Sequence, residues 1–170
     1  MKPVPNLSIY WWMSLAAMII IFIVLLLDTR YNVATMLELE FAPTQGAFFA
    51  TMIDNAYTKA FLEKCIYIDY AFIVAFTSLF CFSIIILRTN YGKKLSFYHR
   101  SLMLLPGVLD VCENTIMLLM VRHGGVSKLT YHLQMIIVYS KWVLVIPCTI
   151  LAVRVLLLEA NRIIVLFRKA

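Results

Sequence analysis

The sequence predicts an all-α membrane protein, a bundle of four transmembrane helices with an amphipathic helix in the loop before the second span. Of its 170 residues 63% are hydrophobic and 14% are charged, whereas about a quarter of a soluble domain is charged. Apolar runs long enough to cross a bilayer occur at residues 11–27, 65–87, 102–121 and 135–158. The basic residues fall largely between and after these runs. The whole chain is therefore expected to form a single integral membrane domain.

The first span is expected at residues 11–27. Trp11 and Trp12 begin it, and tryptophan favours the headgroup level of a bilayer. The polar residues Asp28 and Arg30 close it. A cleaved signal peptide is the alternative interpretation, but no small-x-small cleavage site follows the apolar run, which favours a span.

The loop at residues 28–64 holds five acidic residues, Asp28, Glu38, Glu40, Asp54 and Glu63. Pro43 and Gly46 interrupt it. From Ala47 onward apolar residues recur at helical spacing, at Phe48, Met52, Ala56, Ala60 and Phe61. This pattern predicts an amphipathic helix that leads into the second span and either caps the bundle or lies on the membrane.

The later spans contain polar residues. Asp69 enters the second span about one turn from its start, flanked by Tyr67 and Tyr70. Lys141 interrupts the fourth span, and Pro147 predicts a kink or local opening there. The tail, residues 159–170, alternates basic and apolar residues and is expected to lie at the membrane interface.

The orientation follows from the basic residues outside the spans. Four spans place both termini and the loop at residues 88–101 on one side of the membrane. That side carries eight basic residues and the opposite side five. Because basic residues favour the cytoplasm, both termini are expected there.

The third span has an acidic face. Asp110, Glu113 and Asn114 are spaced i, i+3 and i+4, so they project from one side of a helix. Each ionisable group at the centre of a bilayer costs about 2.5 to 3.5 kcal/mol on insertion scales, so such residues mark a functional site by default. Pro106 and Gly107, one turn earlier, would let a neighbouring helix approach closely. The opposite face is expected to meet lipid or packing partners, with Val111, Cys112, Thr115, Leu118 and Leu119.

Three spans bring polar groups to a similar depth. With a rise of about 1.5 Å per residue, Asp69 lies ~6 Å, Lys141 ~9 Å, Glu113 and Asn114 ~10 to 12 Å, and Asp110 ~16 Å from the same face of the membrane. The sequence therefore predicts one polar pocket built from these five residues, with Tyr70 beside them.

The leading hypothesis is that this pocket binds, and by acid/base chemistry converts, a small lipophilic molecule from the bilayer. Asp110 and Glu113 are the acid/base candidates, because closely spaced carboxylates in a low dielectric cannot all be ionised together. Asn114 would orient the ligand, Asp69 and Tyr70 would contact it, and Lys141 would serve as a counter-ion.

The alternative hypothesis is an accessory or assembly subunit whose charges join the helices. Lys141 would then pair with Glu113 or Asp69, and Arg154 would pair with Asp110 or extend to the interface. Besides membrane lipid, its partner would be another membrane protein or, in a homo-oligomer, further copies of the same chain. Proton-coupled or ion transport is a third class, and it is disfavoured because four spans line a conduit only as an oligomer.

Other classes find no support in the sequence. The histidines lie at the rim of the spans and no helix carries an HxxxH or ExxH spacing, so neither a metal site nor a haem or other cofactor is expected. The basic residues are juxtamembrane, which argues against nucleic acid. The cysteines show no paired spacing and are expected to be small buried hydrophobes, at Cys65, Cys81, Cys112 and Cys148.

The stretch LDVCENTIMLL around Asp110, Glu113 and Asn114 resembles a group of small four-span membrane proteins without an assigned activity. These carry an LDxxEN motif in the third span and an aspartate near the start of the second, here Asp69. The resemblance covers roughly residues 28–121 and implies the same four-span layout. In architecture alone the chain is also similar to sterol isomerase-like membrane proteins, which have acidic residues inside a helical bundle; no motif is shared with them.

Overall fold

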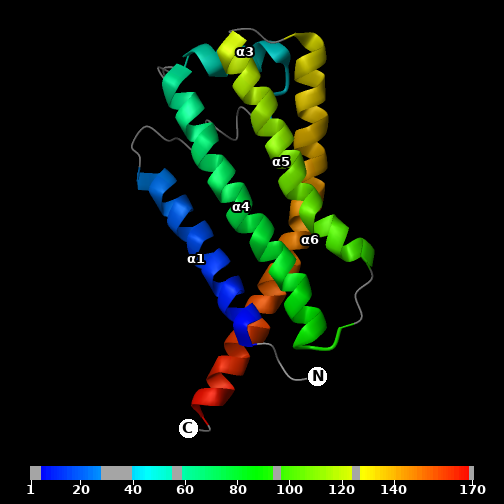
Figure 1. Cartoon of the computed structure of the whole chain (residues 1–170). Coiled ribbons are helices and arrows are strands. Elements are labelled where there is room, and N and C mark those ends of the chain that lie inside the picture. The colour runs from blue at the N-terminus through cyan, green and yellow to red at the C-terminus, as the bar shows by residue number, and fades with distance from the viewer. Residues whose placement is uncertain (1–4, 28–39, 55–58, 94–96, 124–126, 169–170) are drawn as a thin grey trace.

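The computed structural model describes residues 5–27, 40–54, 59–93, 97–123 and 127–168. Four long helices pack together, α1 (Pro5–Leu27), α4 (Lys59–Thr89), α5 (Phe97–His123) and α6 (Lys128–Phe167), with the short helix α3 (Gln45–Asp54) between the first two (Figure 1). Each long helix is apolar and long enough to cross a membrane. The predicted fold, an all-α bundle of four spans with a helix before the second, is confirmed.

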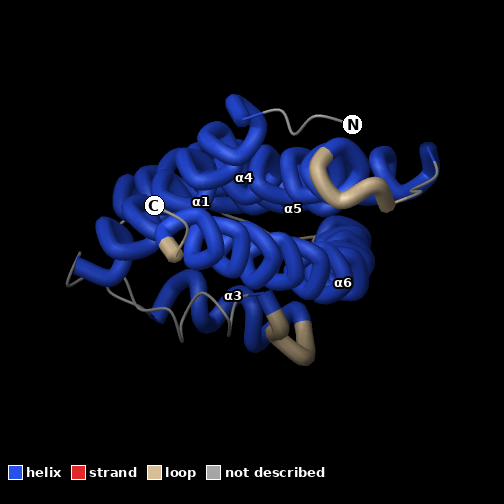
Figure 2. The backbone as a smooth tube through the Cα atoms, turned by 90° about the horizontal axis from the view of Figure 1, so that it is seen from below, coloured by secondary structure: helices blue, strands red, loops and turns tan. Residues whose placement is uncertain are grey.

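Helix α4 is the centre of the bundle. It packs against α1, α5 and α6, and α5 packs against α6. Seen from below, α6 lies between the layer of α4 and α5 on one side and α3 on the other (Figure 2). The start of α1 and the end of α6 lie at the same end of the bundle, opposite α3 (Figure 1). This places the two ends of the chain on one side, as four spans require.

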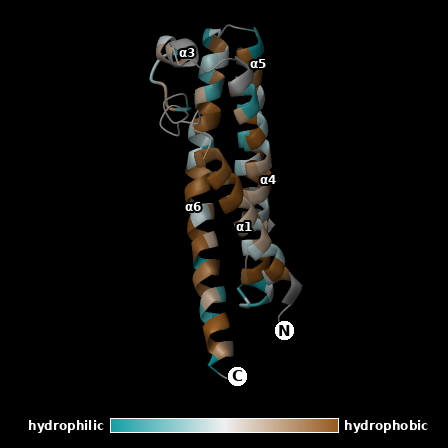
Figure 3. Ribbon diagram, turned by 90° about the vertical axis from the view of Figure 1, so that its left-hand side faces the viewer, coloured by the Kyte–Doolittle hydropathy of each residue, from teal (hydrophilic) through white to brown (hydrophobic). Residues whose placement is uncertain are grey.

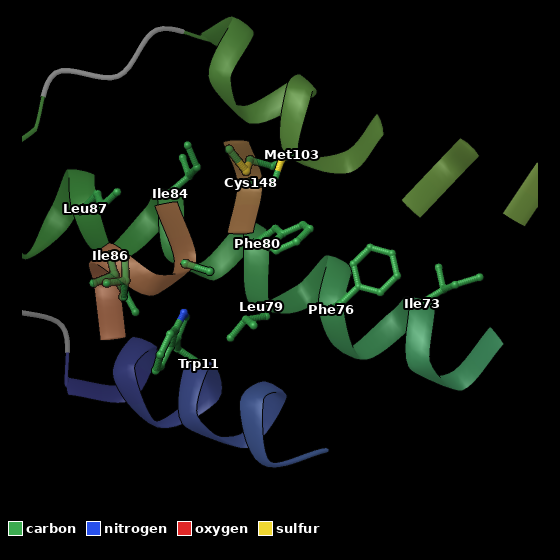
Figure 4. Packing of buried hydrophobic residues seen from close by; sticks show 12 residues of the cluster. Trp11, Ile73, Phe76, Leu79, Phe80, Ile84, Ile86, Leu87, Met103 and Cys148 are labelled. Carbon is green, nitrogen blue, oxygen red and sulfur yellow. The ribbon is translucent and has the colours of Figure 1, made fainter. Parts of the chain in front are cut away.

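The main hydrophobic core joins α1 to α4 near the chain ends. Trp11 reaches from α1 toward a row of α4 side chains that includes Leu79 and Ile86 (Figure 4). Its side chain is 1% exposed, and its indole N–H donates to Ser83 Oγ at 2.8 Å. Trp11 therefore packs in the core between α1 and α4, and its depth in the membrane stays a prediction. The indole needs a hydrogen-bond acceptor when buried, and Ser83 supplies one inside the bundle.

The segment before α3 is anchored on α6. Tyr131 donates its hydroxyl hydrogen to the carbonyl oxygen of Ala42 at 2.7 Å, and its ring contacts that of the fully buried Phe48. Thr44 caps α3 by accepting a hydrogen bond from the backbone N–H of Ala47 at 3.1 Å. The predicted helix before the second span is thus present as α3, and α4 begins at Lys59. Several loop residues that the sequence singled out lie outside the described part of the chain, namely Asp28, Arg30, Glu38 and Ala56.

The long helices extend beyond the apolar runs that predicted them. Helix α1 begins at Pro5, and α6 continues through 40 residues to Phe167, so most of the predicted interfacial tail is a continuation of the fourth span's helix. Pro147 lies inside α6, and in Figure 1 the gold part of this helix is upright whereas its orange part leans across the bundle. Proline removes a backbone hydrogen bond and favours such a bend.

Helices α4 and α5 approach closely at a glycine. A Cβ atom added to Gly107 would clash with the side chain of Thr77 in α4. The predicted role of this glycine, which is to admit a neighbouring helix, agrees with the packing. The close approach fixes how α5 faces the rest of the bundle.

Candidate functional site

Lys141, which is buried, lies at the centre of the polar cluster. Its ammonium nitrogen Nζ is 2.6 Å from Glu113 Oε2, 3.0 Å from Asp110 Oδ1 and 3.1 Å from Glu40 Oε1. The contact with Glu113 is the shortest, but it lies off the direction of a good hydrogen bond, whereas the other two are hydrogen bonds. Lys141 therefore joins α5, α6 and the segment before α3.

The second interaction of the cluster links α4 to α5. The Asn114 side-chain amide donates to Asp69 Oδ2 at 2.7 Å. Asp69 is half-buried, while Asn114 is 5% exposed. The structure thus brings together the five residues predicted to share one layer, Asp69, Asp110, Glu113, Asn114 and Lys141.

The spacing of the acidic face explains its burial. Asp110, Glu113 and Asn114 are all buried, and Glu113 is 1% exposed. The opposite face of α5 is turned outward, as predicted: Val111, Cys112, Thr115 and Leu119 are exposed and Leu118 is half-buried. The expectation that Cys112 is buried is wrong, because this cysteine belongs to the outward face. A helix places residues i, i+3 and i+4 on one side, so a single rotation of α5 buries the whole motif.

Glu40 belongs to the site, although the sequence analysis placed it only in the acidic loop. Its Oε2 accepts a hydrogen bond from the indole N–H of Trp142 at 3.1 Å, and its Oε1 accepts one from Lys141. The ring of Phe41 packs on that of Trp142. Depth along a span, the signal used for the other residues, does not apply to a loop. The hydrogen bonds from Lys141 and Trp142 hold the Glu40 side chain, and the Phe41–Trp142 ring contact lies beside it.

A cavity of about 360 Å³ adjoins the acidic residues. Glu40, Asp69, Asp110 and Lys141 line one end of it. Apart from Thr149, the rest of the wall is apolar or aromatic and comes from α1, α4 and α6, with Trp11, Leu15, Met18, Phe72, Phe76, Leu79, Phe80, Val145 and Leu156 among its residues. Concave, mostly apolar sites with a few polar groups are the usual form of small-molecule sites, which span roughly 300 to 1,000 Å³.

Not every predicted site residue reaches this cavity. Asp69, Asp110 and Lys141 line it, whereas Glu113 and Asn114 lie behind them, outside the lining. Tyr70 shares a hydrogen bond with Thr115 at 3.0 Å on the outside of α4 and α5. Arg154 has an exposed side chain, and Asp110 pairs with Lys141 rather than with it.

A second polar cluster lies at the opposite end of the bundle. Glu159, which is 0% exposed, accepts a hydrogen bond from the Tyr91 hydroxyl at 3.1 Å and pairs with Arg162 at 2.8 Å. Arg162 in turn donates to Ser8 Oγ at 3.2 Å. Burial, with the charge of Glu159 second, raises the pKa of Tyr91 to about 12. The phenol therefore stays protonated and keeps donating throughout the neutral range, which ties the ends of α1, α4 and α6 together.

One further buried polar residue has no sequence signal. Gln134 in α6 is 0% exposed, and neither polar atom of its side chain is hydrogen-bonded within the part of the chain that the structure describes. It precedes Lys141 by two helical turns. The sequence analysis missed it because a single glutamine at the start of an apolar run is ordinary at a helix end.

The acidic residues surround Lys141 rather than a metal position. Within the described ranges, no three His, Cys, Asp or Glu side chains gather in a way that could hold a metal ion. His123 and His132 are exposed. The described geometry therefore presents a charged wall beside an apolar cavity.

Comparison with protein-family models, with curated proteins and with solved structures finds no match to this chain. The resemblance to the LDxxEN group rests on the motif alone.

Proposed function

We propose that this multi-pass membrane protein binds a lipophilic molecule in the cavity between α1, α4 and α6. The observation that carries the proposal is the composition of the wall, which is acidic at one end and apolar along the remainder. Such a wall suits an amphiphile whose polar group meets the acids and whose chain lies along the aromatic residues. The bilayer supplies molecules of this kind directly to a cavity bounded by membrane helices.

Acid/base conversion of the bound molecule is a narrower proposal, and Asp110 is the residue best placed for it. Asp110 is 7% exposed and lines the cavity, so it is within reach of a bound polar group. Glu113 lies outside the lining and contacts Lys141. In this proposal Asp110 exchanges a proton with the ligand, while Glu113 holds Lys141 in place.

One observation favours the alternative, an accessory subunit with structural charges. The Glu113–Lys141 pair is packed inside the bundle with side chains 2% and 6% exposed. A pair of this kind joins two helices whether or not a ligand binds nearby. The two functions can be distinguished because a lipophile-binding protein needs the cavity, whereas an accessory subunit does not.

Orientation is part of the proposal. The chain ends lie at the end of the bundle opposite α3 (Figure 1), and the excess of basic residues on that side favours the cytoplasm. In this orientation the acidic end of the cavity is in the non-cytoplasmic half of the membrane. Hydrophilic ribbon also gathers toward this half in Figure 3, near α3.

The test is mass spectrometry of lipophiles that copurify with the protein in detergent. Val145 lines the cavity, whereas Val143, two residues earlier, is 70% exposed on the outside of α6. We expect the unchanged protein to carry a lipophile in stoichiometric amount, Val145→Phe to lose it because the added ring fills the cavity, and Val143→Phe to retain it.

Equal retention by both variants, each still folded by circular dichroism, would contradict binding in this cavity. Absence of any lipophile from the unchanged protein would favour the accessory function instead.

A further inference from the structure

The charges on the cavity wall indicate which polar group a ligand should carry. The charged residues of the lining are the acids Glu40, Asp69 and Asp110 and the base Lys141. Glu113 adds a further carboxylate directly behind Lys141. Among the described residues at this end of the cavity, acidic groups therefore outnumber basic ones by four to one.

Lys141 has little capacity left for a ligand. An ammonium group has three N–H donors and no acceptor. Three carboxylates, from Glu40, Asp110 and Glu113, lie within 3.1 Å of its nitrogen. Lys141 donates hydrogen bonds to Glu40 and Asp110 and forms an ion pair with Glu113, so an acceptor on a ligand would have to compete with three carboxylates for the ammonium group.

Two carboxylate oxygens on the wall accept no hydrogen bond from the described residues. Asp69 uses Oδ2 to accept the Asn114 amide, and Asp110 uses Oδ1 to accept Lys141. Within the described segments no donor is hydrogen-bonded to Asp69 Oδ1 or to Asp110 Oδ2. A ligand that meets this end of the cavity must therefore bring hydrogen-bond donors, and a positive charge strengthens such bonds.

The remaining wall sets the shape of the ligand. The lining along α6 runs from Lys141 to Leu156, which is about 22 Å at 1.5 Å per residue. Trp142, which also lines the cavity, contributes an aromatic ring near the acidic end. A single apolar chain fits along this path, and the aromatic ring is a further favourable neighbour for a cation.

We infer that the ligand is a single-chain lipophile with a protonated primary amine, its ammonium group held by Asp69 and Asp110 and its chain lying along α1, α4 and α6. This inference rests on the proposed function, since it names the chemical class of the molecule that the cavity takes. The same charges repel a long-chain carboxylate, and a long-chain alcohol, which has one O–H donor and no charge, should bind more weakly than the amine.

The experiment compares three probes of equal chain length, dodecylamine, dodecanol and dodecanoate. The full chain is placed in nanodiscs of neutral phosphatidylcholine at pH 7, where an alkylamine is protonated. Binding is followed by tryptophan fluorescence, because Trp11 and Trp142 both line the cavity, and empty nanodiscs correct for partitioning. We expect dodecylamine to bind at least about tenfold more tightly than dodecanol, since charge-assisted hydrogen bonds are the stronger ones, and dodecanoate to bind least.

Matched variants assign the preference to the cavity. Asp69→Asn removes one acid of the wall and should abolish most of the preference for the amine. Glu63→Gln removes one negative charge from the same end of α4 at a residue that pairs with Arg122 and lies outside this cavity, so it should leave the preference intact. Asp110→Asn provides a second test of the wall, and thermal melting shows that each variant is folded.

Equal binding of amine and alcohol by the unchanged protein would overturn the inference, as would an unaltered preference in Asp69→Asn. Either result would still agree with a cavity that binds a lipophile, but the polar group of that lipophile would not be an amine. Failure of all three probes to bind, together with the absence of a copurified lipophile, would instead contradict the proposed function itself.

Discussion

An ammonium group inside a helical bundle, such as that of Lys141, is removed from water at a cost that ion pairs offset only in part. Glu113, Asp110 and Glu40 all approach it within 3.1 Å. The lysine also keeps these carboxylates from facing one another without a cation between them. Removal of Lys141 would leave buried carboxylates without a counter-ion, and this loss is the main way in which the lysine affects stability.

Lys141→Met is expected to destabilise the protein by about 3 to 5 kcal/mol, the range for breaking a buried ion pair by removing one partner. Thermal or denaturant unfolding in detergent measures this effect. The control is Arg154→Met, because Arg154 is exposed on the same helix and should change the free energy of unfolding by less than about 1 kcal/mol. Equal effects of the two substitutions would show that the cluster does not depend on the lysine.

Some residues of the site could be predicted from the sequence, and others could not. Asp110, Glu113 and Asn114 could be predicted as one buried face because helical spacing fixes which side chains point together. Glu40 could not, because a loop residue has no periodicity to show where it returns to the bundle. The burial of Trp11 could not be predicted, since tryptophan suits both a membrane interface and a core that offers an acceptor such as Ser83.

The contact between α4 and α5 depends on a residue without a side chain. A Cβ on Gly107 would meet Thr77, whose hydroxyl is buried and has no hydrogen-bond partner within the described residues. Because Thr77 belongs to a helix, it cannot move away without shifting α4. The registration of Asp69 against Asn114, which crosses the same pair of helices, depends on this spacing.

Gly107→Ala should therefore destabilise the bundle by about 1 to 3 kcal/mol, the usual cost of overpacking, even though alanine favours helix over glycine by about 1 kcal/mol. Gly46→Ala is the matched control. Gly46 is also helical, and its nearest neighbour would be Thr44 Oγ1 at 3.9 Å, an ordinary contact. Unfolding curves of the two variants should shift in opposite directions; a stabilised Gly107→Ala variant would contradict the close approach.

Helices were predictable as elements, but their ends were not. The apolar runs located all four long helices. Hydropathy marks only the apolar part of a helix, however, and the structure extends α6 through polar residues such as Glu159 and Arg162. These residues bond to Tyr91, just after α4, and to Ser8 of α1. Tertiary hydrogen bonds of this kind involve residues far apart in the chain and cannot be read from a local pattern.

The bundle has an acidic region at one end of its cavity. At its opposite end, hydrogen bonds and an ion pair join the ends of the helices. Ser8, Tyr91, Glu159 and Arg162 hold α1, α4 and α6 together at the end where the chain begins and finishes. Lys141 and its partners organise the opposite end. Between them the apolar wall is continuous along α6. The four-span layout could be predicted from composition and spacing, whereas the cavity depends on side-chain packing that a sequence does not display.

The most direct test of this account is photo-crosslinking with a long-chain primary amine that carries a diazirine at the end of its chain. After irradiation in neutral nanodiscs, mass spectrometry maps the labelled residues. The account predicts labelling at the apolar end of the cavity, around Leu15 of α1 and Leu156 of α6, and its suppression by excess dodecylamine. Labelling spread over the outward faces of the helices, at residues such as Ile20 and Val143, and unaffected by dodecylamine would contradict it.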